Sequence, residues 1–274
     1  KFDVVAHSMG GLVLRYYLRY GRATLADDGS LPPLTWAGAE LVERALLIGT
    51  PNAGSAEARH DLVLGSDLGP FIPEDPPGIL GTMPSVYQLL PRPRHGTFGR
   101  RETGPANADF TQPAFWQEMR WGLVAPGLEK KLEVLLPGLD SPTRRSQTAL
   151  EHLDKCLHAT RVIHRALDAA NRRPDGLYMH LIAGDARPTY LRCSARRGDT
   201  ALATDQTGAG DGTVSRASAL LDERVGGRWV PRIVSPLKWD SIMYLSSNHL
   251  GLTRDPVAIR NILHLLYESP HDRG

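Results

Sequence analysis

The stretch Asp3–Gly21, DVVAHSMGGLVLRYYLRYG, passes from a strand pattern into a helix pattern with almost no residues between them. Phe2–Ala6 is an apolar run of the kind found in buried parallel strands, and Gly10–Tyr20 has apolar side chains at helical spacing. Because a strand and a helix need different backbone conformations, their junction must be a tight, strained bend with Ser8 at its tip. Proteins keep such strain mostly at functional sites, so Ser8 is the first candidate functional residue.

Small residues surround this serine. The segment Ala6-His7-Ser8-Met9-Gly10 departs from the nucleophile-elbow pattern G-x-S-x-G only at its first residue, which is one methyl group larger. The bend lifts the Ser8 hydroxyl clear of the backbone, and the start of the following helix favours developing negative charge. We therefore predict that Ser8 is a nucleophile and that the Met9 backbone N–H is one oxyanion-hole donor. An ordinary buried serine in a tight turn is the alternative.

The composition describes a globular chain of 274 residues with a formal net charge of +2. No block of like charges stands out, which argues against a nucleic-acid partner. Cys156 and Cys193 form neither a metal-site pattern nor a disulfide framework, and both two free thiols and one disulfide fit them. The segment GTPNAG at 49–54 lacks the pattern of a phosphate-binding loop, so nucleotide binding is not expected. We predict neither a metal nor an organic cofactor.

Strand and helix patterns alternate along the chain. Further buried strands are predicted at Arg44–Gly49 and Leu177–Gly184, with another strand near Trp229–Val234. A short helix is predicted around Ala217–Asp222 and a last one at Pro256–Tyr267, with a buried face made by Ile259, Ile262, Leu263 and Leu266. This alternation predicts an α/β fold with a mostly parallel sheet covered by helices on both faces.

An insertion over residues 55–175 is predicted to separate two parts of the core, 1–54 and 176–274. A long amphipathic helix lies inside it, with an apolar stripe from Leu150 to Ala170. Unstructured loops of this length are uncommon, so we interpret the insertion as a cap or lid that is able to contact a lipid surface. Its aromatic residues fit an acyl-binding surface and an ordinary cap core equally well; they are Phe110, Phe115, Trp116 and Trp121.

A serine nucleophile needs a histidine base, which in this arrangement follows the acid along the chain. His249 lies in a polar loop before the last helix, where a base comes over the carboxyl edge of the sheet, and we favour it. His7 lies inside the elbow and is expected to point aside. We expect the long helix to present His152, His158 and His164 to solvent. We expect His264 to pack within the last helix.

Two aspartates compete for the role of the acid. Asp185 follows the apolar run of the third predicted strand, and Asp211 lies in GDGTV, where glycines let its carboxylate approach closely. Gly-Asp-Gly is also a common turn sequence. Spacing alone favours Asp211 only slightly.

Five segments, in the same order, resemble the lecithin:cholesterol acyltransferase and phospholipase family of α/β hydrolases. They are AHSMGG at 6–11, IGTPNAGS at 48–55, PSVYQLLP at 84–91, GDGTVS at 210–215 and NHLGL at 248–252. The resemblance implies an α/β-hydrolase fold with a cap, in which the aspartate of the GDGTV run is the acid and the histidine before the last helix is the base. These residues are Asp211 and His249.

The resemblance further implies a serine hydrolase or acyltransferase that acts on lipid or other hydrophobic esters. Hydrolysis and transfer share every step up to deacylation, and a non-catalytic binding module of the same fold is the alternative. We expect His7, Thr50 and Pro51 to line the substrate-binding rim beside Ser8. The family's first strands and its second oxyanion donor are expected upstream of Lys1, so we interpret the chain as an N-terminally truncated fragment.

Overall fold

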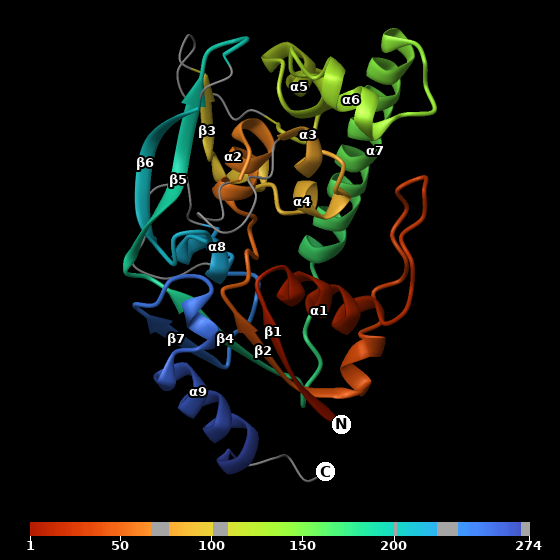
Figure 1. Ribbon diagram of the computed structural model, residues 1–274. Helices are drawn as coiled ribbons and strands as arrows, with labels where there is room; N and C mark the ends of the chain where they lie inside the picture. Colours follow the sequence, from red (N-terminus) through yellow and green to blue (C-terminus); the bar gives the residue numbers. More distant parts are fainter. Residues whose placement is uncertain (67–76, 101–108, 200–201, 224–234, 270–274) are drawn as a thin grey trace. The chain divides into compact units, whose positions relative to one another are not determined.

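The computed structural model describes residues 1–66, 77–100, 109–199, 202–223 and 235–269 (Figure 1). The chain divides into two compact units. Unit 1 consists of Lys1–Ala53, Arg165–Tyr190 and Thr207–Gly274, and unit 2 consists of Gly54–His164 and Leu191–Gln206.

Two stretches and the single residue Gly54 are assigned differently from the division expected from the sequence. Residues 165–175 belong to unit 1, and residues 191–206 belong to unit 2. The second difference has a structural reason, because the chain makes a separate three-stranded sheet in the order β3-β5-β6. Its strands are β3 (Phe98–Arg100), β5 (Arg187–Ala195) and β6 (Ala203–Gly210), and none of the three was predicted.

Unit 1 is built on a four-stranded sheet in the order β1-β2-β4-β7, in which every neighbouring pair is parallel (Figure 1). In this register His7 lies opposite Ile48, and Gly184 lies opposite Leu245. The carboxyl ends of the strands therefore meet at one edge of the sheet. The strands are β1 (Phe2–His7), β2 (Val42–Ile48), β4 (Tyr178–Gly184) and β7 (Ser241–Leu245); the helices of unit 1 are α1 (Met9–Tyr20), α8 (Arg216–Leu220) and α9 (Pro256–Leu263).

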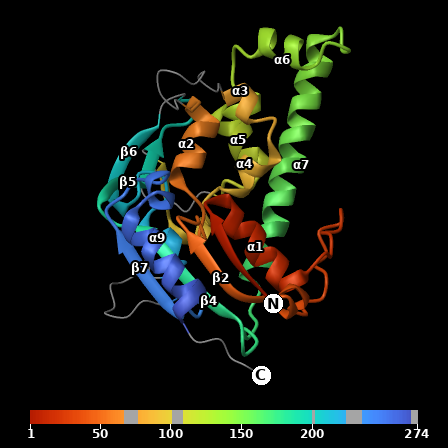
Figure 2. The ribbon, with the colours of Figure 1, turned by 60° about the horizontal axis from the view of Figure 1, so that its bottom comes forward.

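Alternate residues of each strand face different helices, as the two-residue period of a strand requires. Leu181 of β4 packs in one cluster with Leu14 of α1. Its neighbour Ile182 packs in another cluster with Ala258 of α9. Figure 2 shows α1 and α9 on opposite sides of β2 and β4. The prediction of a mostly parallel sheet with helices on both faces is confirmed.

The last strand of the described chain is β7, which the sequence analysis did not predict. Its apolar run, Ile242 to Leu245, is the signal that was available. The strand expected near Trp229–Val234 lies outside the described residues. The strands predicted at Arg44–Gly49 and Leu177–Gly184 are present as β2 and β4.

The buried face predicted for the last helix is wrong in part. Ala258 and Ile262 pack against the sheet, whereas Ile259 and Leu263 are 43% and 47% exposed. Of the predicted face, Ile262 is therefore confirmed and Ile259 and Leu263 are wrong, while Ala258 packs on the sheet without having been predicted. After α9 the chain continues as a π-helical segment, η5 (His264–Glu268), in which His264 is exposed and hydrogen-bonds Glu268 at 2.8 Å instead of packing.

Unit 2 is mostly helical, and its long helix α7 confirms the amphipathic helix predicted inside the insertion. The aromatic residues predicted to form either an acyl-binding surface or an ordinary cap core are all buried in one cluster; they are Phe110, Phe115, Trp116 and Trp121. This burial is that of core residues, and an acyl-binding role for them stays a prediction. The helices with residues in unit 2 are α2 (Ala56–Leu64), α3 (Pro77–Leu80), α4 (Pro84–Gln88), α5 (Pro113–Met119), α6 (Glu129–Leu135) and α7 (Pro142–Asp168).

The polar side of α7 is less solvated than predicted. His164 is buried and donates from Nε2 to the backbone oxygen of Gln88 at 2.9 Å, and the Nε2 atom of His158 is also buried. The cysteines are two buried free thiols, which decides between the two alternatives left by the sequence. Burial raises the pKa of the Cys156 thiol to about 11, so it remains protonated near neutral pH. In the described part of the chain, every helix is too short or too polar to cross a bilayer.

Candidate active site

Ser8 lies between the last residue of β1 and the first residue of α1. Its backbone has φ 53° and ψ −128°, a conformation that residues with a side chain rarely adopt. Its N–H donates to the Ile48 backbone oxygen at 2.8 Å, so the β1–β2 pairing continues up to the bend. The strained strand-to-helix bend expected from the sequence is therefore present at Ser8, at a cost of about 1–3 kcal/mol.

Small residues let the helix begin this close to the sheet. A Cβ atom built on Gly11 would lie 2.0 Å from Oγ1 of Thr50, which leaves no room for a side chain. A Cβ atom on Gly10 would lie 3.9 Å from that of Ala6, which is an ordinary contact. The extra methyl group at the first position of the elbow pattern is therefore accommodated without a clash.

Thr50 and Pro51, which the sequence analysis placed on a substrate-binding rim, are both buried. Thr50 is fully buried, and its hydroxyl has no hydrogen-bond partner in the part of the chain that the structure describes. Its position beside Gly11 is that of a packing residue. A contact of these two residues with substrate stays a prediction.

The imidazole of His249 bridges the other two predicted side chains. Its Nε2 atom lies 2.8 Å from Oγ of Ser8, and its Nδ1 atom lies 2.8 Å from Oδ2 of Asp211. Because a carboxylate only accepts, Nδ1 carries the proton of the neutral ring, and Nε2 is free to accept the Ser8 O–H. All three residues belong to unit 1, and they follow β1, β6 and β7.

The carboxylate of Asp211 is held on both of its oxygens. Asp211 is 1% exposed, and Oδ1 accepts the backbone N–H groups of Thr213 at 2.9 Å and Val214 at 2.7 Å. The remaining oxygen, Oδ2, faces His249. The GDGTV turn therefore fixes the direction of the carboxylate, which is a role for its backbone that the sequence analysis did not identify.

Two glycines make room for this pair of side chains. A Cβ atom on Gly184 would lie 2.5 Å from the Cβ atom of Asp211. Gly49 has φ 55°, and a Cβ atom there would lie 3.2 Å from Oδ2 of Asp211 and from Nδ1 of His249. Both glycines directly end or follow sheet strands, so the acid and the base lie against the backbone at the carboxyl edge of the sheet.

The side chain of His7 does not point aside, as predicted, but contacts the base. Its Nε2 atom donates to the backbone oxygen of His249 at 3.0 Å, and the two ring centroids are 4.7 Å apart. Burial lowers the pKa of His7, which favours the neutral ring. The structure thus places His7 as a support for the His249 loop, and its predicted contact with substrate stays a prediction.

The competing aspartate has a different neighbour. Oδ2 of Asp185 lies 3.8 Å from the guanidinium of Arg216, which itself lies over the ring of Tyr244. Of the two aspartates left open by spacing, it is therefore Asp211 that the structure brings to His249. Met9 is the first residue of α1, and the first N–H groups of a helix lack acceptors within the helix, as an oxyanion donor requires.

One group of side chains in the described residues has the geometry of cation ligands. Glu57, His60 and Asp61 of α2 bring their ligand atoms within 4.8 Å of one another. The group belongs to unit 2, whereas the three residues around His249 belong to unit 1. Neighbouring polar side chains on one helix turn are common without an ion, so we assign no metal to them.

Neither a family model nor a curated protein matches the chain. A solved structure described as "The crystal structure of Tle4-Tli4 complex" is similar, with a TM-score of 0.61 and 16% sequence identity. The similarity covers 98% of this chain and 59% of that chain, so this chain spans about three fifths of its length. At this identity the similarity shows the fold. The chain has an α/β-hydrolase fold, with a mostly parallel sheet and helices on both faces.

Proposed function

We propose that the protein is a serine hydrolase or O-acyltransferase that acts on lipid or other hydrophobic esters through an acyl-enzyme on Ser8. The observation that carries the proposal is the imidazole of His249, which hydrogen-bonds both the Ser8 hydroxyl and the Asp211 carboxylate at 2.8 Å. A hydroxyl held by a base that is itself oriented by a buried carboxylate is the arrangement of an activated nucleophile.

In the acylation step, Oγ of Ser8 attacks the ester carbonyl carbon while Nε2 of His249 takes the hydroxyl proton. The negative charge that develops on the carbonyl oxygen is stabilised by the Met9 N–H and by the positive end of α1. Asp211 stabilises the imidazolium without taking its proton. The tetrahedral intermediate then collapses, and His249 gives the proton to the departing alcohol. The acyl group remains on Ser8 as an ester.

In the second step, His249 takes the proton of an incoming hydroxyl, whose oxygen attacks the acyl carbon of the ester on Ser8. The bond between that carbon and Oγ of Ser8 then breaks, and His249 returns the proton to Oγ. Water as the attacking group gives a free acid, and a second alcohol gives a new ester. The proposed substrate class rests on the resemblance to the lecithin:cholesterol acyltransferase and phospholipase family, carried by segments that include residues 6–11, 210–215 and 248–252. A lipid ester is accordingly the substrate we propose.

Labelling with a fluorophosphonate tests the proposal directly, because only an activated serine reacts with it. We expect Ser8 of the wild-type protein to be labelled, and Ser8→Ala and His249→Ala to lose the label. Ser30→Ala, which changes an exposed serine, is the control and should label like the wild type. No label on correctly folded wild-type protein would reject the enzyme and favour a binding module. Product analysis with a phospholipid and an alcohol acceptor then separates hydrolysis from transfer.

A further inference from the structure

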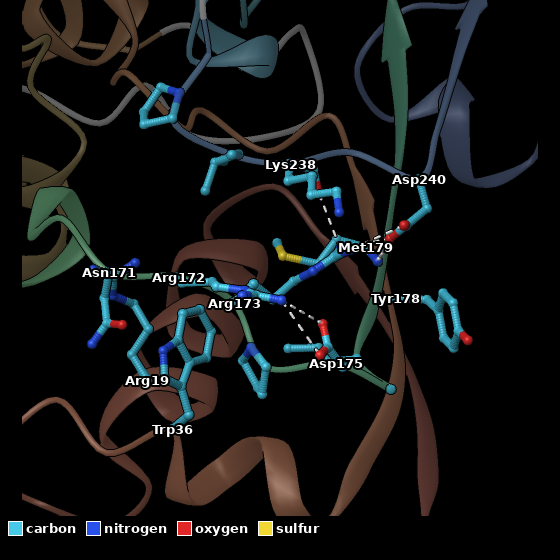
Figure 3. A pocket seen from close by; sticks show the side chains of 15 residues that line it. Arg19, Trp36, Asn171, Arg172, Arg173, Asp175, Tyr178, Met179, Lys238 and Asp240 are labelled. Carbon is cyan, nitrogen blue, oxygen red and sulfur yellow. Dashed lines mark hydrogen bonds and ion pairs between the residues drawn. The ribbon is translucent and has the colours of Figure 1, made fainter. Parts of the chain in front are cut away.

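The two ends of the parallel strands in unit 1 hold polar groups with different roles. At the amino end, the wall of a cavity of about 410 Å³ includes charged side chains that pair with each other (Figure 3). Arg173 pairs with Asp240 at 2.5 Å, and Asp240 also accepts the Met179 N–H at 2.6 Å. These contacts join the start of β4 to the residue before β7. At the carboxyl end, polar contacts meet at the turn that holds Asp211, and one of them comes from a threonine outside that turn.

Thr189 of β5 is buried beside the Asp211 turn. It is 2% exposed, whereas the two preceding residues, Arg187 and Pro188, are exposed. Oγ1 of Thr189 accepts the backbone N–H of Gly212 at 2.9 Å and donates to the backbone oxygen of Arg187 at 3.0 Å. Because a carbonyl oxygen only accepts, the hydroxyl proton points to Arg187, and a lone pair of Oγ1 is left for the Gly212 N–H. The hydroxyl is therefore held in one orientation.

The Gly212 N–H belongs to the peptide group that joins Asp211 to Gly212. The carbonyl oxygen of the same peptide group accepts the backbone N–H of His249 at 2.9 Å. Because a peptide group is planar, Thr189 and His249 together set the direction of its plane. This plane is bonded to the Cα atom of Asp211, so it also affects where the carboxylate points. A chain of hydrogen bonds thus connects the Thr189 hydroxyl, through the main chain of the proposed acid, to the main chain of the proposed base.

Thr189 also contacts the residue on the other side of Asp211. A Cβ atom built on Gly210 would lie 2.3 Å from Oγ1 of Thr189 and 2.5 Å from the backbone oxygen of Val214. Gly210 must therefore lack a side chain for the hydroxyl to approach the turn this closely. Arg187 and Asp211 form a parallel β-bridge, which brings the start of β5 alongside the turn. Thr189 is thus packed against both chain neighbours of Asp211.

The other contacts of the Asp211 carboxylate come from within its own turn. Oδ1 accepts the backbone N–H groups of Thr213 and Val214. Because both residues belong to the same turn as the acid, they fix the carboxylate relative to the turn, but not the turn relative to His249. Thr189 belongs to β5, a different segment of the chain. Its hydroxyl therefore holds the turn from outside.

We propose that Thr189 is a positioning residue, whose hydroxyl holds the Asp211 turn so that Oδ2 of Asp211 faces Nδ1 of His249. The role rests on the proposed function, in which Asp211 is the acid and His249 is the base. Thr189 acts through Asp211 and not through the substrate. Loss of its hydroxyl should therefore lower kcat and leave KM nearly unchanged.

Two substitutions separate the hydroxyl of Thr189 from its shape. Thr189→Val keeps the shape and removes the hydroxyl, and it should lower kcat for a chromogenic acyl ester about tenfold, with KM changed by less than about twofold. Thr189→Ser keeps the hydroxyl and should restore kcat to within about threefold of the wild type. Thr160→Val is the matched control, because Thr160 is fully buried and its hydroxyl donates to the Cys156 backbone oxygen within α7. It removes a similar hydrogen bond and should leave kcat within about twofold of the wild type.

A double-mutant cycle tests whether Thr189 acts through the acid. In the Asp211→Asn background, Thr189→Val should change kcat by less than about twofold, because the carboxylate that it positions is already absent. A further loss of about tenfold in that background would reject the positioning role. Equal kcat values for Thr189→Val and the wild type would reject it as well, and so would an effect of Thr189→Val that appears mainly in KM.

Proton NMR of the whole chain tests the position of the carboxylate without any ester turnover. The Nδ1 proton of a histidine that donates to a carboxylate resonates far downfield of the amide protons, and its absence from His249→Ala identifies the signal. We expect Thr189→Ser to keep the wild-type signal, and Thr189→Val to shift it toward the amide region or to lose it. An unchanged signal in Thr189→Val would reject the positioning role, whatever the kinetic result. An altered signal in a protein whose wild type does not react with a fluorophosphonate would support the positioning of Asp211 and reject the proposed function alone.

Discussion

Nδ1 of His249 lies 2.8 Å from Oδ2 of Asp211, and the backbone N–H of His249 donates to the Asp211 carbonyl oxygen at 2.9 Å. The proposed base is thus joined to the proposed acid through its side chain and its main chain. Ser8 contributes to the same group from a distant part of the sequence through one hydrogen bond to the imidazole. The orientation of the ring is therefore set by Asp211.

Asp211→Asn should lower kcat for a chromogenic acyl ester by about 10⁴-fold. The asparagine oxygen can take over the N–H groups of Thr213 and Val214, which leaves its amide donating toward His249 and favours the wrong tautomer. Steady-state kinetics measures the effect. Asp185→Asn is the matched control, because Asp185 pairs with Arg216, and it should change kcat by less than about threefold. The reverse result would transfer the role of the acid to Asp185.

Ser8→Ala and Ser8→Gly should both reduce ester turnover by several orders of magnitude, but they should differ in stability. Alanine keeps a Cβ atom at φ 53°, whereas glycine adopts this conformation without strain. We expect Ser8→Gly to unfold at a higher urea concentration, with a free energy of unfolding about 1 kcal/mol above that of Ser8→Ala. Equal midpoints for the two variants would mean that the bend stores no strain at this residue.

Gly184→Ala should lower both activity and stability by displacing Asp211. Its new methyl group would meet Cβ of Asp211 at 2.5 Å and must displace the carboxylate from His249. We expect a loss of about 1–3 kcal/mol in the free energy of unfolding and at least a tenfold loss of kcat. Gly138→Ala is the control, because no atom lies within 4 Å of its new methyl group. Full activity of Gly184→Ala would show that Asp211 can move without consequence.

His7→Ala should lower kcat by about tenfold, because it removes the donor to the backbone oxygen of His249 and so loosens the base. Since His7 acts through His249, KM for a short ester should change little. His7→Gln is the informative partner, because its amide N–H can replace the lost donor and should restore part of the rate. If His7 instead binds substrate, as the sequence suggested, the main effect of both variants should appear in KM.

Asp240→Asn should make stability less dependent on acid pH. Burial alone would raise the Asp240 pKa, but hydrogen bonds from Arg173 and the Met179 N–H outweigh it and hold the pKa below the usual 3.8. The carboxylate therefore stabilises the fold above about pH 4, and this stabilisation is lost as the pH falls through the lowered pKa. Urea unfolding should show a loss on the order of 1 kcal/mol at pH 7, shrinking toward pH 2. A difference that is constant with pH would contradict the pairing.

The sequence correctly predicted the elements whose own residues determine their structure. The apolar run of β1 and the small residues around Ser8 leave one arrangement of strand, bend and helix, and the structure has it. Asp211 and His249 were identified by their places in the chain order and by resemblance, and the structure brings both to Ser8. The competing Asp185 has a similar place at a strand end, so its different neighbour became visible only in three dimensions.

Other features depend on contacts that the sequence does not encode locally. The stripe of Ala258 and Ile262 has the same helical period as the stripe of Ile259 and Leu263, so only packing on the sheet decides which is buried. β7 is a short strand, and its apolar run has no distinctive period. The contact of His7 with His249 joins residues that are far apart in the sequence, so no local pattern predicts it.

In the described four-stranded sheet, Ser8 follows β1 and His249 follows β7, and β2 and β4 lie between these two strands. The distance between the two side chains therefore depends on all three strand pairings, β1 with β2, β2 with β4 and β4 with β7, and a local opening of any one of them separates the hydroxyl from the imidazole. On mild warming, the hydroxyl and the imidazole should therefore drift apart while most of the backbone signal persists. Turnover would then be lost at a lower temperature than the circular dichroism signal, and an enzymatic assay would report local opening of this sheet before the fold is lost.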